Sequence, residues 1–524
     1  MMKRRNLLLG AGGTLIGLVT AQKGWEGIAQ STSPWLNDYP FKLGVASGDP
    51  RSDSVVIWTR LVANPLSDRP FSRTPVPVQW QVATDEQMRQ VVARGTTLAT
   101  PEFAHAVHVV VNGLSPDRWY WYQFKVGNSA NSEISPEGRT KTAPTRQSPL
   151  TPIKFAFASC QNYEHGYFNA YRHMAEEDLD FVLHLGDYIY EGAGIPLPNL
   201  TRIHNGAEPT DLSGYRRRYA QYKLDPDLQA AHRVFPFICT WDDHEVDNDY
   251  ANAQSQDFDS ITNFLQRRAA AYQAYYEHLP LRPESKPTGS ALQLYRRFQL
   301  GALLQMHVLD TRQYRDDQPC ANGKGGGQIV TNCQERLDPP RSLLGTQQEH
   351  WLLHGLTTSK ARWNVIAQQY LVAELRQAVD TQESFWSDGW DGYAATRQRL
   401  LNTLAERKPA NPIFLGGDIH SFWVTDLKSD FRNPASPILA SEFVGTSISS
   451  NGIPDDRVSA VLPNNPHIKF FESRLRGYVR CTITRDRWLS ELRAVDTVKQ
   501  KQSSIRTLAA FVVEAGKPGA QRSL

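Results

Sequence analysis

The sequence of 524 residues lacks a clear excess of charge of either sign, because it contains 57 basic and 54 acidic residues. If residues 1–29 are removed as a leader, four basic residues and one acidic residue go with them, and 53 of each sign remain. A protein that binds nucleic acid through bulk positive charge carries a basic surplus. The composition therefore excludes that class, and its 40% apolar and 10% aromatic residues indicate a globular chain.

The apolar stretch at the N-terminus, from Leu7 to Val19, is too short for a typical membrane span. It follows the basic residues Lys3, Arg4 and Arg5, a pattern typical of a signal peptide, here residues 1–29. The adjacent arginines favour export by the twin-arginine translocase over an ordinary Sec signal or an uncleaved anchor. We therefore expect a periplasmic or extracellular protein.

Cysteine is scarce, with five residues in the whole chain. Cys320 and Cys333 bracket the glycine-rich segment "CANGKGGGQIVTNC". In an exported protein, such a pair is typical of a disulfide that closes a flexible loop, and two free thiols are the alternative.

The length of the chain predicts more than one domain, and the sequence shows neither an internal repeat nor a heptad array. Residues 40–145 contain short alternating or aromatic runs, which predict an immunoglobulin- or fibronectin-like β-sandwich. A linker rich in Thr, Pro and Ser follows, at 140–152. Residues 152–495 alternate apolar strands with helical stretches, which predicts a layered α/β catalytic domain. The C-terminal segment, 496–524, fits either a strand or a helix with a frayed tail.

Four apolar strands of the predicted α/β domain end in polar clusters. These clusters are "ASCQN" (158–162), "LGDYIY" (185–190), "WDDHEVDND" (241–249) and "GGDIHS" (416–421). Each is a weak signal alone, since a lone Gly-Asp is most often a turn. Together they predict one site, assembled at one edge of the sheets from distant parts of the chain.

The order of these clusters resembles that of the calcineurin-like metallophosphoesterases, which carry Asp-x-His, Gly-Asp-x-x-Asp, Gly-Asn-His-Asp/Glu and Gly-His-x-His. The resemblance implies a layered domain with two packed sheets flanked by helices. It implies that Asp187 bridges two metal ions and that Asp418 and His420 are metal ligands. Two positions depart from the pattern: Cys160 lies where the first ligand motif is expected, and Tyr190 replaces the second Asp of the Gly-Asp motif.

The third motif offers two candidates for its metal ligand. The family spacing favours Asp243, whereas the family's usual amide ligand favours Asn248, so both are candidates. His244 matches the histidine of this motif, which implies a general acid or a phosphate-orienting residue; a purely structural histidine is the alternative. Arg312, in "LDTRQYR", is a candidate bidentate fork for phosphate, with a surface ion pair as the alternative.

The two departures indicate a particular metal. A phenolate is a poor ligand for Mg²⁺ or Zn²⁺ but a good one for Fe³⁺, which strongly lowers the phenol's pKa. Purple acid phosphatases have a tyrosine at the position of Tyr190. A thiolate at Cys160 also favours a transition metal over calcium or magnesium. The remaining candidates offer oxygen atoms, which suit Ca²⁺: Asp187, Asp243, Asn248 and Asp418.

The complete set of motifs most resembles the PhoD-like alkaline phosphatases, and "KLGVASGDPRSDSVVIWTRL" and "LDTRQYR" extend the resemblance over most of the chain. That family is exported by the twin-arginine route, pairs an N-terminal β-sandwich with a phosphoesterase domain, and uses Fe³⁺ with Ca²⁺ on phosphate esters. The resemblance implies the same for this sequence. We also expect a monomer.

Hydrolysis of a phosphate ester needs a nucleophile and charge relief at the phosphoryl oxygens. Metal ions about 3.5–4 Å apart can activate a hydroxide and clamp the phosphoryl group. The sequence lacks the Asp-Ser nucleophile motif of the other alkaline phosphatase type, so direct in-line attack is the hypothesis. A phosphodiesterase or phospholipase D-like enzyme with the same metals is one alternative. A surface-binding protein with an inactive phosphoesterase domain is another.

Overall fold

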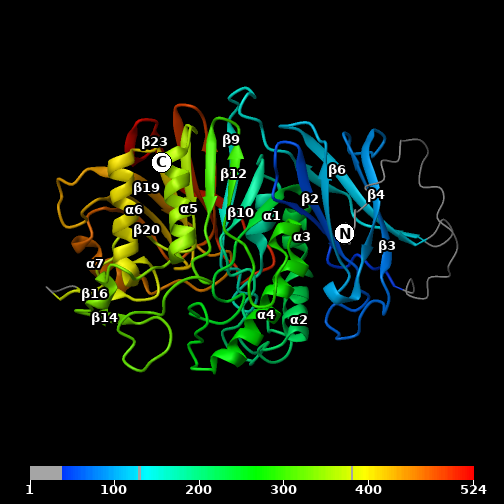
Figure 1. Cartoon of the computed structure of the whole chain (residues 1–524), viewed down its shortest axis with the longest axis horizontal. Coiled ribbons are helices and arrows are strands. Elements are labelled where there is room, and N and C mark those ends of the chain that lie inside the picture. The colour runs from blue at the N-terminus through cyan, green and yellow to red at the C-terminus, as the bar shows by residue number, and fades with distance from the viewer. Residues whose placement is uncertain (1–37, 128–131, 379–381) are drawn as a thin grey trace, which may run out of the picture.

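The computed structural model describes residues 38–127, 132–378 and 382–524, so the predicted signal peptide 1–29 lies outside the described residues. Two large sheets run through the molecule, with the N-terminal strands at one end and helices α5 (Gly345–Thr358) and α6 (Ala394–Arg407) at the other (Figure 1). The fold is mixed α/β with several sheets. Across the described ranges, no helix has the length and apolar character needed to cross a membrane.

The larger sheet has ten strands. Its central strands are parallel and consist of buried apolar runs, "IKFAFA", "FVLH" and "PFIC", as expected for strands covered on both faces. The strand order is β24 (Lys517–Arg522), β23 (Ile505–Glu514), β22 (Arg487–Val495), β21 (Arg476–Ile483), β9 (Ile153–Ala158), β10 (Phe181–His184), β11 (Pro236–Cys239), β1 (Val45–Gly48), β2 (Ser54–Arg60) and β5 (Ala106–Asn112). The C-terminal segment is therefore strand rather than helix.

The second large sheet has seven strands, and its four middle strands β13, β15, β17 and β19 are parallel. Its order is β12 (Arg296–Leu300), β13 (Leu304–Val308), β15 (Trp363–Ala367), β17 (Pro412–Gly416), β19 (Ile438–Val444), β18 (Phe422–Lys428) and β20 (Ile468–Glu472). A small two-stranded sheet joins β14 (Ile329–Thr331) and β16 (Ser384–Trp386).

One apolar core joins the two large sheets. It contains Phe155 and Leu183 from the first sheet and Val365 and Leu415 from the second. Separate apolar clusters hold the helices on the outer faces. The helices α1 (Asn169–Ala175), α2 (Leu212–Lys223), α3 (Pro226–Val234) and α4 (Ile261–His278) pack with the first sheet, and α5, α6 and α7 (Asp455–Val461) pack with the second.

The N-terminal region adds a further sheet, with the order β4 (Val91–Ala99), β3 (Val76–Ala83), β6 (Trp119–Gly127) and β7 (Ser132–Ile134), and with β8 (Gly138–Lys141) beside β6. Alternate residues of β6 are buried, because neighbouring side chains of a strand point to opposite faces. They share an apolar core with β2 and β5. Since β1 also pairs with β11 through Ser47–Pro236 and Gly48–Phe237, these N-terminal strands are continuous with the large sheet.

Cys320 and Cys333 form the expected disulfide. It closes the loop that contains β14, and Gly327 of this loop donates its N–H to the Asp249 carboxylate at 2.8 Å. The other cysteines, Cys160, Cys239 and Cys481, are free and buried.

Candidate metal centre

The predicted site residues follow the carboxyl ends of parallel strands in both large sheets. Cys160, Asp187 and Asp418 come two or three residues after β9, β10 and β17. These three residues, and His420 as well, have positive φ angles between 50° and 62°. This backbone region is uncommon for residues other than glycine, and such residues cluster at functional sites. The sharp turns point side chains of both sheets toward one place.

Contacts between the two sheets fix this meeting point. Ser159, beside Cys160, forms a parallel bridge with Ser447, and its carbonyl accepts the N–H of Ile448 at 2.9 Å.

Gly186 has a φ of +114°, and an added Cβ would lie 2.6 Å from the backbone nitrogen of Asp242. Glycine is therefore needed here, because the second and third clusters are in direct backbone contact.

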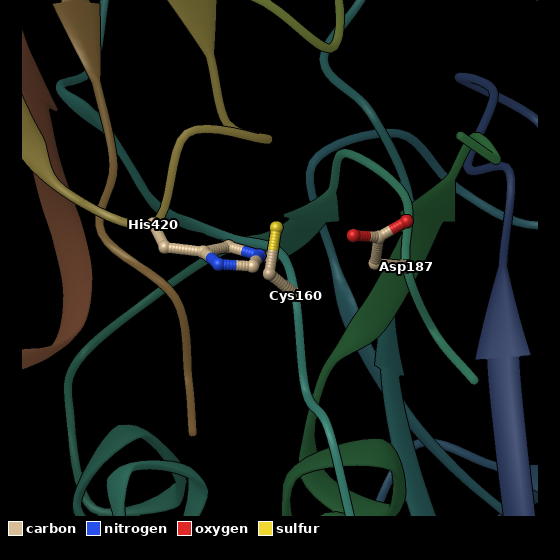
Figure 2. A group of neighbouring side chains, drawn as sticks. All are labelled: Cys160, Asp187 and His420. Atoms are coloured by element: carbon tan, nitrogen blue, oxygen red, sulfur yellow. The ribbon is translucent and has the colours of Figure 1, made fainter. Parts of the chain in front are cut away.

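One part of the site combines sulfur, phenol and imidazole groups. Ligand atoms of Cys160, Asp187 and His420 lie within 4.8 Å of one another, and Figure 2 shows the thiol between the imidazole and the carboxylate. The Tyr190 hydroxyl donates to Asp187 Oδ2 at 2.8 Å and lies 3.0 Å from His420 Nε2. We call Cys160, Tyr190 and His420 the Cys–Tyr side of the site, with Asp187 at its border.

Hydrogen bonds orient the Cys–Tyr side. Nδ1 of His420 lies 2.8 Å from the carbonyl of Asn451, which can only accept a hydrogen bond. Nδ1 therefore carries the proton, and the lone pair of Nε2 faces the site, as in metal-ligating histidines. The Ser450 hydroxyl donates to the Tyr190 oxygen at 2.9 Å, which fixes the phenol ring.

The other part of the site consists of carboxylates. Ligand atoms of Asp242, Asp243 and Asp418 lie within 4.8 Å of one another, and we call these residues the carboxylate side. Asp187 and Asp243 form a third group of this kind with His244, so Asp187 connects the two sides. Asp242 was absent from the predicted ligands, although it precedes Asp243 directly.

The site buries carboxylate oxygens that receive no hydrogen bond from the protein. Asp187 Oδ1 and Asp243 Oδ1 are buried without a hydrogen-bond donor. Burial, together with the neighbouring carboxylates, raises the pKa of Asp187 and Asp418 well above the ordinary value. Burial and Asp187 likewise raise the pKa of the Cys160 thiol and the Tyr190 phenol. A bound cation would reverse each of these shifts and would satisfy the unpartnered oxygens.

Arg312 lies at the base of the carboxylate side, fully buried. Its Nε donates to Asp242 Oδ1 at 2.6 Å, Nη1 is 2.9 Å from Asp388 Oδ2, and Nη2 is 3.4 Å from Asp243 Oδ1. The guanidinium is therefore a buried counter-charge to three carboxylates. The structure does not place it as the open fork that the sequence analysis considered.

His244 is paired with a carboxylate that the sequence analysis did not single out. Its Nδ1 lies 2.7 Å from Glu191 Oε2, and its ring lies 4.1 Å from that of Tyr190 between centroids. The Glu191, Asp243 and Asp187 carboxylates raise the pKa of His244 well above its usual value, against the opposing effect of burial. A protonated imidazole at this position can donate a proton.

The second candidate of the third motif has other partners. The side-chain amide of Asn248 donates to Gln256 Oε1 at 2.8 Å, and its backbone N–H donates to Glu191 Oε1 at 2.8 Å. Asp243, by contrast, belongs to two of the ligand groups described above.

Glu245 joins the second and third clusters through backbone groups. Its carboxylate accepts the N–H groups of Asp187, Tyr188 and Asp242 at 3.1, 2.6 and 2.8 Å. Glu245 lies within the third cluster of the sequence, but only the folded loops show what it holds. It fixes the backbone on both sides of Asp187 and Asp242.

Two packed sheets carry a convergent set of possible metal ligands at their strand ends. Comparisons with known proteins identify the chain as a phosphoric ester hydrolase and give its family. The chain belongs to the PhoD-like phosphatase family: residues 155–492 match the PhoD-like phosphatase and residues 27–144 match its N-terminal domain. It is 46% identical to alkaline phosphatase D of Bacillus subtilis (strain 168), over 99% of this chain and 89% of that protein. This similarity confirms the predicted family and the phosphatase function.

Solved structures agree with this assignment. The structure of PhoD superposes with a TM-score of 0.89 at 46% identity, covering 93% of both chains. A purple acid phosphatase from yellow lupin (Lupinus luteus) seeds superposes with a TM-score of 0.56 at 12% identity, over 91% of this chain and 74% of that one. At that identity, the second likeness concerns the fold alone.

Proposed function

We propose that this phosphatase acts with Fe³⁺ on the Cys–Tyr side and Ca²⁺ on the carboxylate side. Cys160, Tyr190, His420 and Asp187 would hold the iron, because thiolate, phenolate and imidazole favour a transition metal. Asp187 and the carboxylate side offer oxygens alone, which suits calcium. The observation that carries the proposal is this division of ligand types around one shared carboxylate.

The residues fit such ions in charge as well as in type. Asp187 Oδ1 has no hydrogen-bond donor, and Asp243 Oδ1 has only the Arg312 guanidinium at 3.4 Å, so a cation would stabilise both oxygens. When bound, the ions would supply an activated water and neutralise the phosphoryl oxygens. Asn248 is the alternative to Asp243 as the ligand of the third motif, and Asp242 joins the candidates through its contact with Asp243 and Asp418.

The chain's own residues then have distinct tasks. His244 donates a proton to the departing ester oxygen, since Glu191 holds its Nδ1 and favours the imidazolium. Arg312 is a positioning residue that holds Asp242 and Asp388. The proposed reaction is a direct in-line transfer to water without a phosphorylated enzyme.

The remaining expectations belong to the same proposal. We propose that residues 1–29 direct export by the twin-arginine translocase to the periplasm or the outside of the cell, and that the enzyme is a monomer. We also propose that residues 40–145 are a fibronectin-like sandwich, which the shared apolar core of β2, β3, β5 and β6 supports. Residues 152–495 carry catalysis, and the segment 496–524 completes the large sheet.

Metal content measured together with activity tests the proposal. Protein from a host that exports it folded should contain iron near one per chain together with calcium. It should hydrolyse p-nitrophenyl phosphate at alkaline pH and lose activity in a chelator. An active enzyme that holds zinc or manganese and no iron would make Tyr190 and Cys160 packing residues. A phosphate monoester and a diester compared on the same preparation would show which ester class is preferred.

A further inference from the structure

An apolar cavity of about 320 Å³ opens beside the carboxylate side of the site. Its walls come from the second large sheet and the segments around it: the loop after β15, the strands β16 and β18, the turn 390–393 and helix α7. The apolar lining includes Leu371, Leu375, Trp386, Trp390, Trp423 and Val458. Cavities of this size commonly receive small molecules.

Several polar groups of these walls are already satisfied elsewhere, and Arg457 is exposed. The indole N–H of Trp390 donates to Gln368 Oε1 at 2.9 Å, and that of Trp423 donates to Ser421 Oγ at 2.8 Å. Asp391 is paired with Arg397 at 2.6 Å and also accepts the N–H of Leu375. An occupant therefore meets mainly ring faces and aliphatic groups, which favour an apolar partner.

The cavity reaches the reacting centre through one residue. Asp418 lines the cavity, and its carboxylate also belongs to the group with Asp242 and Asp243. Ile419, the next residue, also lines the cavity, and His420 beyond it contributes to the Cys–Tyr side. A phosphoryl group held at the carboxylates would thus lie at one end of this cavity.

We propose that this cavity binds the apolar alcohol portion of the substrate, so that the enzyme prefers phosphate esters of aromatic alcohols. This rests on the phosphatase function and does not depend on which metals are bound. The ring of Trp386, which is 37% exposed, offers a face for a fused ring, and Leu375 and Val458 enclose it. The pocket therefore selects the leaving group, whereas the ligand cluster holds the phosphate.

A pair of esters with leaving groups of similar acidity tests the preference. Wild-type enzyme should hydrolyse 2-naphthyl phosphate with a kcat/KM about tenfold above that for phenyl phosphate, because the second ring gains apolar contacts. Free 2-naphthol should inhibit competitively and more strongly than phenol. These comparisons use the full chain and its native metals.

Two variants perturb the cavity in different ways. Trp386→Ala removes an aromatic wall that is 37% exposed, and Ile453→Asp places a charge at its half-buried edge. Both should bring the naphthyl-to-phenyl ratio of kcat/KM close to one and weaken inhibition by 2-naphthol. Trp351→Ala, on α5 outside the cavity lining, is the matched control and should keep the wild-type ratio.

The outcomes distinguish a failure of the pocket proposal from a failure of the phosphatase function. If wild type hydrolyses both esters equally, or if both cavity variants retain the wild-type ratio and naphthol inhibition, the pocket proposal is overturned and the phosphatase function stands. If wild type loaded with its metals hydrolyses neither ester, the phosphatase function itself fails, and the pocket proposal falls with it.

Discussion

The two sides of the site bury their ligand groups in different ways. On the Cys–Tyr side, the thiol of Cys160 and the phenol of Tyr190 have strongly raised pKa values because of burial, so protons keep both groups neutral. On the carboxylate side, Arg312 contributes a fixed positive charge to Asp242 and Asp243. The Cys–Tyr side is thus neutralised by protons, and the carboxylate side is neutralised in part by the Arg312 guanidinium.

This difference has a consequence for metal binding. An ion that binds on the Cys–Tyr side must replace protons, because thiolate and phenolate are the ligand forms. An ion on the carboxylate side joins groups whose charge Arg312 only partly offsets. Asp187 belongs to both sides, and its Oδ1 lacks a protein donor. Substitutions can therefore affect the two sides together or one at a time.

The largest effect is expected from Asp187→Asn, because this residue connects both sides. Loss of a residue that merely supports a ligand typically costs about 10–100-fold in affinity or activity. Loss of the shared ligand should exceed that range and lower the content of both metals. Metal analysis measures the loss of metals, and kcat on p-nitrophenyl phosphate measures the loss of activity.

Asp178→Asn, which changes an exposed residue paired with Lys154, is the control and should behave as wild type. Retention of both metals in Asp187→Asn would show that this residue does not bridge them.

The next largest effect separates the two candidates of the third motif. Asp243→Asn removes a charge from two ligand groups and should lower calcium content and activity by about a hundredfold. Asn248→Ala removes an amide that contacts Gln256, and it should cost about tenfold or less. Calcium content and kcat of both variants decide the question. The opposite ranking would make Asn248 the ligand and would assign Asp243 to the pairing with Arg312.

The local motifs were sufficient to predict which strand ends come together. Short apolar strands ending in Gly-Asp or in Ser-Cys are local signals, and the folded chain brings their tips together as expected. The partners of a buried side chain are not local. Arg312 was therefore considered as a phosphate fork, although Asp242 and Asp388 surround it. Nothing in the sequence alone linked Glu191 to His244 either.

The fold shows the same limit. The buried strands were recognised from their apolar runs, but the pairing of β1 with β11 joins segments almost two hundred residues apart, which no local pattern specifies. The C-terminal run "TLAAFVVEAG" fitted a strand or a helix, because a short apolar run carries little periodicity. In the structure this run pairs with β22, which shows that it is a strand.

Tyr190→Phe tests the Cys–Tyr side alone. The change keeps the ring and removes the hydroxyl that contacts Asp187 and His420. Iron content and activity should fall by about tenfold, and calcium content should stay at the wild-type level. The visible absorption expected of an iron–phenolate pair should disappear. Unchanged absorption in the variant would mean that the phenol is not an iron ligand.

Glu191→Gln should change the fewest properties, because it leaves both sides of the site intact and changes only the partner of His244. The amide oxygen can still accept the N–H of Asn248, but the charge that favours the imidazolium is lost. If His244 protonates the departing oxygen, kcat should fall by about tenfold for phenyl phosphate and less for p-nitrophenyl phosphate, whose leaving group needs little protonation. Glu176→Gln, at an exposed position, is the control. An equal fall for both esters would assign the Glu191–His244 pair to phosphate orientation, because orientation does not depend on the acidity of the leaving group.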